Sequence, residues 1–163
     1  MYSKAAFVAL FAFFLALGGC DSSPPEFFEP IEIPPPSVIA DSLYTETSTG
    51  LKFYDLQEGT GAVAEGGLAV EYHYIMWLSD STLVRSSYQT RIASVAVLGQ
   101  QALLPGWEEG LEGMRTGGFR QLIIPPDLAY GEFGQPDLGV PPNETLIMEL
   151  ALIGVGIPVD AAQ

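Results

Sequence analysis

The chain has 163 residues, 48% of them hydrophobic, which fits one globular domain with accessory segments. Its 20 acidic and 6 basic residues give a formal net charge of −14 at pH 7. Such a surface repels phosphate groups, so the composition argues against a nucleic-acid-binding protein.

The first element in chain order is an uncharged apolar run over residues 5–19, preceded by Lys4. It is shorter than the roughly 20 apolar residues that a membrane-spanning helix needs, and it is typical of a secretory signal peptide over residues 1–19. The sequence that follows, Leu17-Gly18-Gly19-Cys20, resembles the bacterial lipobox. The resemblance implies cleavage before Cys20 and a diacylglycerol thioether on its sulfur. The alternative is an ordinary signal peptide with a coincidental cysteine.

Lipidation of Cys20 would decide where the protein is located. Two or three acyl chains exceed the single chain that gives only marginal membrane binding, so a stable anchor is expected. We therefore expect a cell-envelope protein on the periplasmic side or the outer surface of a bacterial membrane. Without residues 1–19 the chain keeps 5 basic and 20 acidic residues, a formal charge of −15, which opposes docking on anionic lipid. As the only cysteine, Cys20 also excludes an internal disulfide.

Residues 20–47 differ in composition from the rest of the chain. Six prolines and three glutamates lie between Pro24 and Pro36. Proline favours the extended polyproline II conformation, and like charges extend a chain further. We predict a tether that holds the following domain away from the membrane. A proline-rich ligand for a partner protein is the alternative.

Residues 48–156 carry the pattern of a folded domain, and residues 157–163 form a short tail. The strongest strand pattern is residues 70–78, rich in β-branched and aromatic residues. On the face opposite Tyr72 and Tyr74, Glu71 and His73 are expected to be solvated, whereas Ile75 and Trp77 need cover. Further strands are predicted over residues 51–56, 93–98, 119–124 and 145–155. The buried face of the strongest strand is predicted to carry Val70, Tyr72, Tyr74, Met76 and Leu78.

One segment has the period of a helix. Trp107, Leu111 and Met114 lie at positions i, i+4 and i+7. Pro105-Gly106 marks the start of this helix, and Gly117-Gly118 is expected to end it. About five strands and one short helix predict an α+β domain, in which an antiparallel sheet curls over the helix.

Several segments of this domain resemble one protein family, in the right order and spacing. The start of the predicted helix is the most distinctive of them. The segments are Thr49-Gly50-Leu51-Lys52, Gly59-Thr60-Gly61, Glu71-Tyr72-His73-Tyr74, Leu104-Pro105-Gly106-Trp107-Glu108-Glu109-Gly110-Leu111, Pro126-Asp127-Leu128-Ala129-Tyr130-Gly131 and Val140-Pro141-Pro142-Asn143-Glu144-Thr145-Leu146. Together they resemble the FKBP-type peptidyl-prolyl cis-trans isomerases. The resemblance implies an antiparallel half-barrel sheet of five to six strands around one short α-helix.

The resemblance also implies a groove for a prolyl peptide. Trp107 would form its floor, although the helical period alone favours a buried tryptophan without a ligand. The Leu104 amide N–H and the Tyr130 hydroxyl would donate hydrogen bonds to the substrate, beside Tyr74. The substrate-binding residues implied around them are Val84, Arg85, Leu103, Val140 and Met148. Rotation about an X-Pro bond breaks no covalent bond, so no cofactor and no metal is expected.

Several residues depart from the family pattern, among them Val84 and Met148, which stand where the family usually has phenylalanine. Arg85 stands where the family has a carboxylate, and Ser94 and Ala96 stand where it has phenylalanines. These changes leave a second hypothesis open, a catalytically weak or inactive chaperone or peptide-binding module. The leading hypothesis is an isomerase, a monomer, that acts on proline-containing segments of exported polypeptides. His73, the only histidine, is expected on the outer face without a catalytic role.

Overall fold

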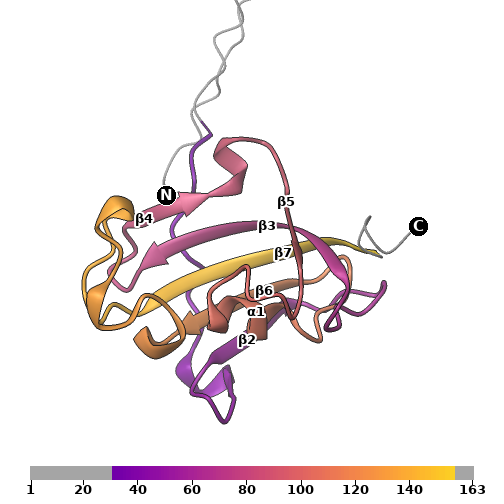
Figure 1. The fold of residues 1–163 in the computed structure, drawn as a ribbon, viewed down its shortest axis with the longest axis horizontal. Helices are drawn as coiled ribbons and strands as arrows, with labels where there is room; N and C mark the ends of the chain where they lie inside the picture. Colours follow the sequence, from indigo (N-terminus) through magenta and orange to yellow (C-terminus); the bar gives the residue numbers. More distant parts are fainter. Residues whose placement is uncertain (1–30, 157–163) are drawn as a thin grey trace, which may run out of the picture.

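The longest strand, β3 (Ala69–Leu78), lies inside one antiparallel sheet that curls around a single α-helix, α1 (Pro105–Leu111) (Figure 1). The computed structural model describes residues 31–156. The other strands are β1 (Thr45–Glu46), β2 (Lys52–Gln57), β4 (Leu83–Ser86), β5 (Ser94–Val97), β6 (Phe119–Ile124) and β7 (Leu146–Gly156). Short 3-10 helices are η1 (Asp41–Leu43), η2 (Ser87–Gln89), η3 (Pro126–Leu128), η4 (Gly131–Phe133) and η5 (Pro136–Leu138).

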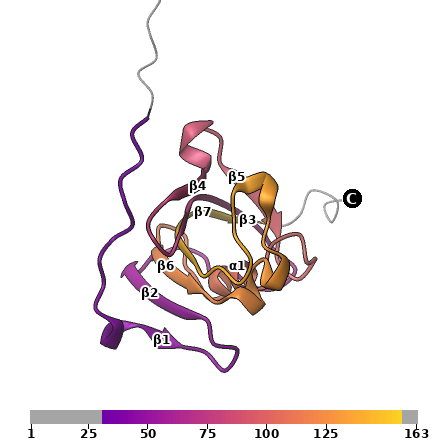
Figure 2. The same ribbon diagram turned by 90° about the vertical axis from the view of Figure 1, so that its left-hand side faces the viewer.

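The sheet has the strand order β1-β2-β6-β7-β3-β4, and β5 pairs with the first half of β3. This confirms the predicted α+β class with its curled antiparallel sheet, built here from seven strands. The strands β1 and β4 were not predicted, because two and four residues are too short to show a period. Figure 2 shows β3, β7, β6 and β2 arching around α1.

The two faces of the sheet follow the alternation of side chains along each strand. Along β3, the inner residues Val70, Tyr72, Tyr74 and Met76 are all buried. Their register partners on β7 include Leu150 opposite Tyr74 and Met148 opposite Met76. These side chains fill the space between sheet and helix and form the core of the domain.

The helix is shorter than its period suggested. It ends at Leu111, not at Gly117, and Met114 lies outside it. The reason is a competing set of backbone bonds, since Gly113 donates to Ala64 O at 2.9 Å and Ala64 donates to Met114 O at 2.8 Å. Gly113 also adopts φ +75°, which a helix excludes. Met114 is nevertheless buried in the core.

The outer face of the sheet is covered by the chain segment before β1. Residues 31–44 cross outside β3, β7 and β6 in both views (Figures 1 and 2). Ser37 donates its backbone N–H to Glu149 Oε1 at 2.8 Å, and Gln121 Nε2 donates to Ser37 O at 2.9 Å. The Tyr44 hydroxyl donates to Gln121 Oε1. The described end of the predicted tether therefore packs on the sheet, and the outer-face Ile75 and Trp77 are buried.

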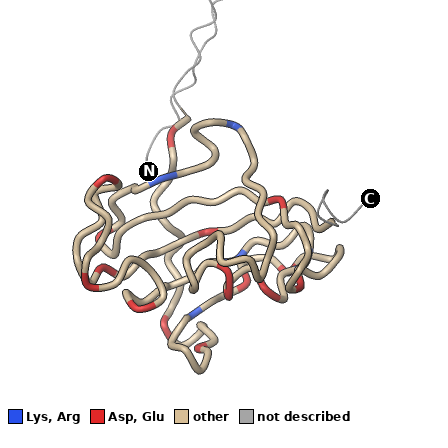
Figure 3. Tube along the Cα trace, in the orientation of Figure 1, with Lys and Arg blue, Asp and Glu red and all other residues tan. Residues whose placement is uncertain are grey.

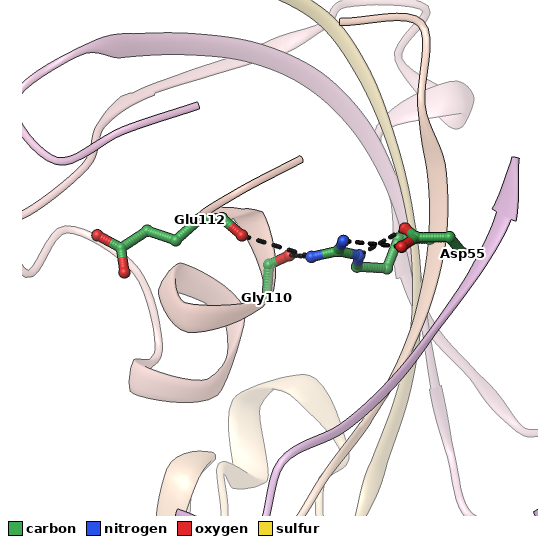
Figure 4. A network of polar contacts seen from close by, with 4 residues as sticks. Asp55, Gly110 and Glu112 are labelled. Atoms are coloured by element: carbon green, nitrogen blue, oxygen red, sulfur yellow. Dashed lines mark hydrogen bonds and ion pairs between the residues drawn. The ribbon is translucent and has the colours of Figure 1, made fainter. Parts of the chain in front are cut away.

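An inner-face arginine ties the sheet to the end of the helix (Figure 4). Arg120 forms a bidentate ion pair with Asp55, with Nε–Oδ1 at 2.7 Å and Nη2–Oδ2 at 2.9 Å. Its Nη1 also donates to Gly110 O at 3.1 Å and to Glu112 O at 3.4 Å. Its guanidinium lies 4.4 Å from the ring centre of Phe53. This one side chain joins β6, β2 and α1.

The predicted signal peptide, the lipidation residue Cys20, the first part of the tether and the tail at 157–163 lie outside the described residues. Within residues 31–156, no helix has the length and apolarity required to span a bilayer.

Candidate functional site

The site forms around Trp107, at the start of α1. Pro105 occupies the first turn, where its missing N–H costs nothing. Gly106 and Gly110 let the helix lie directly on β6, because a Cβ at Gly110 would lie 2.3 Å from a methyl of Leu122. The close approach fixes the height of the helix in the curl of the sheet. Trp107 is thereby held on the inner side of the curled sheet, where its side chain is 8% exposed.

Two tyrosines of β3 contact this indole. The ring centres of Tyr74 and Trp107 are 4.6 Å apart, and those of Tyr72 and Trp107 are 5.8 Å apart with an edge-on geometry. Both distances fall in the range that favours aromatic pairs. The floor of the site is thus an aromatic cluster from two elements, and the ring of Tyr72 was not among the predicted site residues.

Ser87 fixes the position of Tyr74. Its Oγ accepts the backbone N–H of Tyr74 at 2.9 Å and lies 3.3 Å from Tyr74 O, to which it donates. The same Oγ lies 2.9 Å from Nδ1 of His73. Sequence reasoning did not select Ser87, although it ends the Val84-Arg85-Ser86-Ser87 run aligned with the family. Its role could not be predicted, because it depends on η2 folding back onto β3.

The remaining predicted residues gather around the aromatic floor. Val140 and Met148 are buried in the same cluster as Trp107. The partly buried residues packed against this cluster include Val84, Leu103, Leu104 and Tyr130. The structure therefore places the predicted apolar lining in the domain core or packed against it, from β3, β4, β7, the start of α1 and the loop between β6 and β7.

A bulge turns two consecutive residues of β4 toward this face. Trp77 pairs with Leu83 and Met76 pairs with Arg85, so Val84 is the extra residue. Val84 packs against the core cluster, and Arg85 lies opposite the inner residue Met76. Arg85 is exposed. Beside it a hollow of about 240 Å³ opens, lined by Tyr74, Arg85, Ser86, Ser87, Thr90, Ile92, Ala93 and Ser94.

Hydrogen-bond donors without acceptors distinguish this site. The buried Nε1 of Trp107 has no partner among the described residues. The amide of Leu104 and the hydroxyl of Tyr130 likewise donate to none of residues 31–156. A buried donor is normally paired, so the unpaired Nε1 of Trp107 indicates a site for a ligand that brings acceptor oxygens. Peptide carbonyls are such acceptors.

The tyrosine hydroxyls of the site stay protonated near neutral pH. Burial raises the pKa of Tyr74 and of Tyr130, and the Arg85 guanidinium partly offsets the rise in both. Tyr74 and Arg85 also line the same hollow. Both tyrosines therefore present an O–H donor and not a phenolate.

His73 differs from its expected surroundings. It is on the outer face as predicted, but it is half-buried rather than solvated. Its ring stacks on Tyr88 with centres 4.4 Å apart, and its Nδ1 bonds Ser87. The 3-10 helix η2 supplies this cover, which the strand pattern could not show. Among residues 31–156, no cluster of His, Cys, Asp or Glu has the arrangement of a metal site.

Comparison with known proteins agrees with this geometry. An FK506-binding protein of Neisseria meningitidis is 41% identical over 106 residues, 65% of this chain and 96% of that protein. The crystal structure of FkpA from Escherichia coli superposes with a TM-score of 0.66 at 33% identity, over 72% of this chain and 53% of that one. A peptidyl-prolyl cis-trans isomerase from Pseudomonas syringae superposes with a TM-score of 0.64 at 31% identity, over 72% and 84% of the two chains.

A model of the family described as "FKBP-type peptidyl-prolyl cis-trans isomerase" matches residues 61–153, more than half of the chain. The match includes β3, α1 and the loop that carries Tyr130. The chain belongs to the FKBP-type peptidyl-prolyl cis-trans isomerase family.

Proposed function

We propose that this isomerase acts on X-Pro bonds of exported polypeptides, and that it does so by desolvating and twisting the prolyl amide over Trp107. The observation that carries the proposal is the set of unpaired donors around an aromatic floor. Trp107, Leu104 and Tyr130 supply them, within an apolar lining. No nucleophile or proton transfer is required, because the reaction only rotates a bond.

The chemistry of the amide explains why such a lining is useful. Resonance makes the planar amide polar and opposes rotation by about 18–20 kcal/mol. The twisted amide has lost that resonance and is less polar, so an apolar, water-poor groove favours it relative to water. Each 1.4 kcal/mol of this preference gives about a tenfold increase in rate.

The polar groups then hold the substrate in place. The Leu104 N–H donates to a substrate carbonyl, and the Tyr130 hydroxyl acts as a second donor at the mouth of the groove. These bonds keep one side of the prolyl bond fixed while the other side turns. Because Tyr130 stays protonated, this donor is available throughout the neutral range.

The activity is tested with the full chain in a non-ionic detergent and a tetrapeptide with a leucine before its proline. Exchange spectroscopy by NMR measures the cis-trans rate without a coupled protease. We expect exchange to rise in proportion to protein concentration. Exchange that stays at the uncatalysed rate with folded protein in excess would reject the mechanism.

A second candidate function, a chaperone or peptide-binding module, is favoured by one observation. Arg85, Ser94 and Ala96 replace residues that the family uses to enclose its ligand, and a hollow lies beside Arg85 and Ser94. A wider groove holds chains without forcing a twist. Saturable binding of the same tetrapeptide without faster exchange would support this function in place of catalysis.

We also propose that the protein is anchored in the cell envelope through a lipid on Cys20. The apolar run, the lipobox-like sequence and the acidic charge of the remaining chain support it. In a bacterial host, replacing Cys20→Ser is expected to move the protein from the membrane fraction to the soluble fraction. Equal membrane retention of both proteins, with no change in mass from a lipid, would refute the anchor.

A further inference from the structure

The hollow beside Tyr74 carries a positive charge and several hydroxyl-bearing side chains, unlike the apolar floor next to it. Three serines and one threonine line it together with Arg85. The Ser94 hydroxyl has no hydrogen-bond partner among residues 31–156. Ser94 pairs with Tyr72 and therefore shares the face of the groove. The hollow opens from the same face that carries the aromatic floor.

Arg85 has no counter-charge among residues 31–156. Neither an ion pair nor a hydrogen bond joins its guanidinium to any described residue, and Asp55 with Arg120 forms the ion pair found elsewhere in the sheet. The rest of the surface is acidic, and Figure 3 shows basic positions few and separated along the trace. A lone arginine at the mouth of a groove, in so acidic a chain, leaves its charge available to a ligand.

No carboxylate lines the hollow, whereas the Arg85 guanidinium and the Ser94 hydroxyl offer donors. Peptide carbonyls can accept from Leu104 and Tyr130, but a guanidinium beside a hydroxyl pairs best with a carboxylate. A volume of about 240 Å³ has room for an acidic side chain and water, since one water takes roughly 30 Å³ of the liquid. The site therefore matches an anion on the substrate.

We propose that this hollow is a specificity subsite for an acidic side chain next to the substrate proline, with Arg85 as its charge and Ser94 as a neutral donor. The inference rests on the proposed function, because it takes the prolyl ring to lie over Trp107. It names the substrate class as polypeptides with Glu or Asp beside proline. A groove with a carboxylate at this position would disfavour the same peptides.

The test uses four tetrapeptides that differ only in the residue before proline: Glu, its neutral isostere Gln, Leu and Lys. The full chain in non-ionic detergent is assayed by NMR exchange at about 20 mM salt. We expect kcat/KM for the Glu peptide to exceed that for the Gln peptide by about two- to fivefold. This ratio corresponds to the stabilisation that one partly exposed ion pair provides. The ratio should shrink toward one at about 1 M salt, where the screening length is near 3 Å.

Variants assign the preference to this subsite. Arg85→Gln is expected to remove the Glu-over-Gln ratio, and Arg85→Glu to favour Lys over Glu. The matched control is Arg115→Gln, which makes the same change of charge on an exposed arginine beyond the far end of α1. The control should keep the wild-type ratio. A ratio that survives in Arg85→Gln would overturn the proposal.

The outcomes separate this inference from the proposed function. If the Leu peptide is isomerised but Glu and Gln peptides react equally, catalysis stands and the subsite is wrong. If no peptide is accelerated, catalysis fails, and chemical-shift titrations with the same peptides decide about the subsite. Tighter binding of Glu than of Gln, lost in Arg85→Gln, would support it, whereas equal binding would reject it.

Discussion

The inner and outer faces of the sheet are built from alternate residues of the same strands, yet they have different roles. Along β3 the inner Tyr72 and Tyr74 meet Trp107, whereas the outer His73 stacks on Tyr88. On β7, Glu149 faces outward and bonds Ser37. On the inner side the buried Nε1 of Trp107 has no partner among residues 31–156, whereas Gln121 and Glu149 of the outer face bond the N-terminal segment. The difference shows that burial alone does not identify a site.

The two tryptophans provide the strongest test of this comparison. Trp107 on the inner side and Trp77 on the outer side are both buried, so each substitution to alanine is expected to cost about 3–5 kcal/mol of unfolding free energy. Only Trp107→Ala removes the floor of the groove. We expect kcat/KM per folded molecule to fall about 100-fold for Trp107→Ala and to stay within about twofold for Trp77→Ala.

Circular dichroism gives the folded fraction of both variants, and the assay is run where each is more than half folded. The more conservative Trp107→Phe should restore part of the activity. Equal loss of activity in both alanine variants would mean that the groove has no special dependence on Trp107.

The next effect concerns stability and not catalysis. Arg120 and Gln121 are neighbours on β6 that face opposite sides, and both are buried. Arg120→Met leaves Asp55 and Gly110 O without their partner, which is expected to lower the free energy of unfolding by about 3 kcal/mol. The control Arg115→Met, at an exposed site, should change it by less than about 0.5 kcal/mol. Urea unfolding measures both.

Gln121→Leu tests the outer face in the same way. The change removes the acceptor of Tyr44 and the donor to Ser37 and Glu149, and we expect a loss of about 2–3 kcal/mol, near 1 kcal/mol for each of the three bonds. Limited proteolysis should cut more quickly around Ser37, because the segment loses its attachment. The rate of isomerisation per folded molecule should not change. A variant that is slower as an enzyme would show that the outer segment supports the groove.

Much of this architecture follows from the sequence. The alternation over residues 70–78 correctly predicted the inner face of β3, since five apolar or aromatic residues at period two leave few other arrangements. The pattern also showed that Ile75 and Trp77 need cover. It could not show that residues 31–44 pack on this outer face, because a proline-rich, acidic segment has no period and resembles a free tether.

The end of the helix and the surroundings of Tyr74 could not be predicted from the sequence, because both depend on contacts between distant parts of the chain. Met114 continues the helical period, but its backbone bonds Ala64 from a distant part of the chain. Ser87 reaches Tyr74 because η2 folds back over β3. In both places the structure is determined by long-range hydrogen bonds and not by local sequence preference. No local pattern links Trp107 with Tyr130, which lies 23 positions later in the chain, so only the family resemblance assigned them to one site.

A smaller effect is expected from one hydroxyl of the groove. Tyr130→Phe removes a donor that has no partner among residues 31–156, so the unfolding free energy should change by less than about 0.5 kcal/mol. Loss of a neutral hydrogen bond of about 1 kcal/mol to the substrate should lower kcat/KM about fivefold. Tyr54→Phe, on the outer side of β2, is the control. An unchanged rate in Tyr130→Phe would remove this hydroxyl from the mechanism.

The smallest effect, near zero, is expected from pH across the neutral range. Burial raises the pKa of Tyr74 and Tyr130 above the ordinary value near 10, so both hydroxyls remain donors and kcat/KM should be flat from pH 7 to 9. Stability behaves differently in alkali. Above about pH 10 the unfolded chain releases phenolic protons that the folded protein keeps, so the free energy of unfolding should fall as pH rises further. Urea midpoints at pH 8, 10 and 11 measure this fall, which should be smaller when Tyr74→Phe removes one buried phenol. A midpoint that is unchanged at pH 11 would mean that these phenols titrate alike in the folded and unfolded chains.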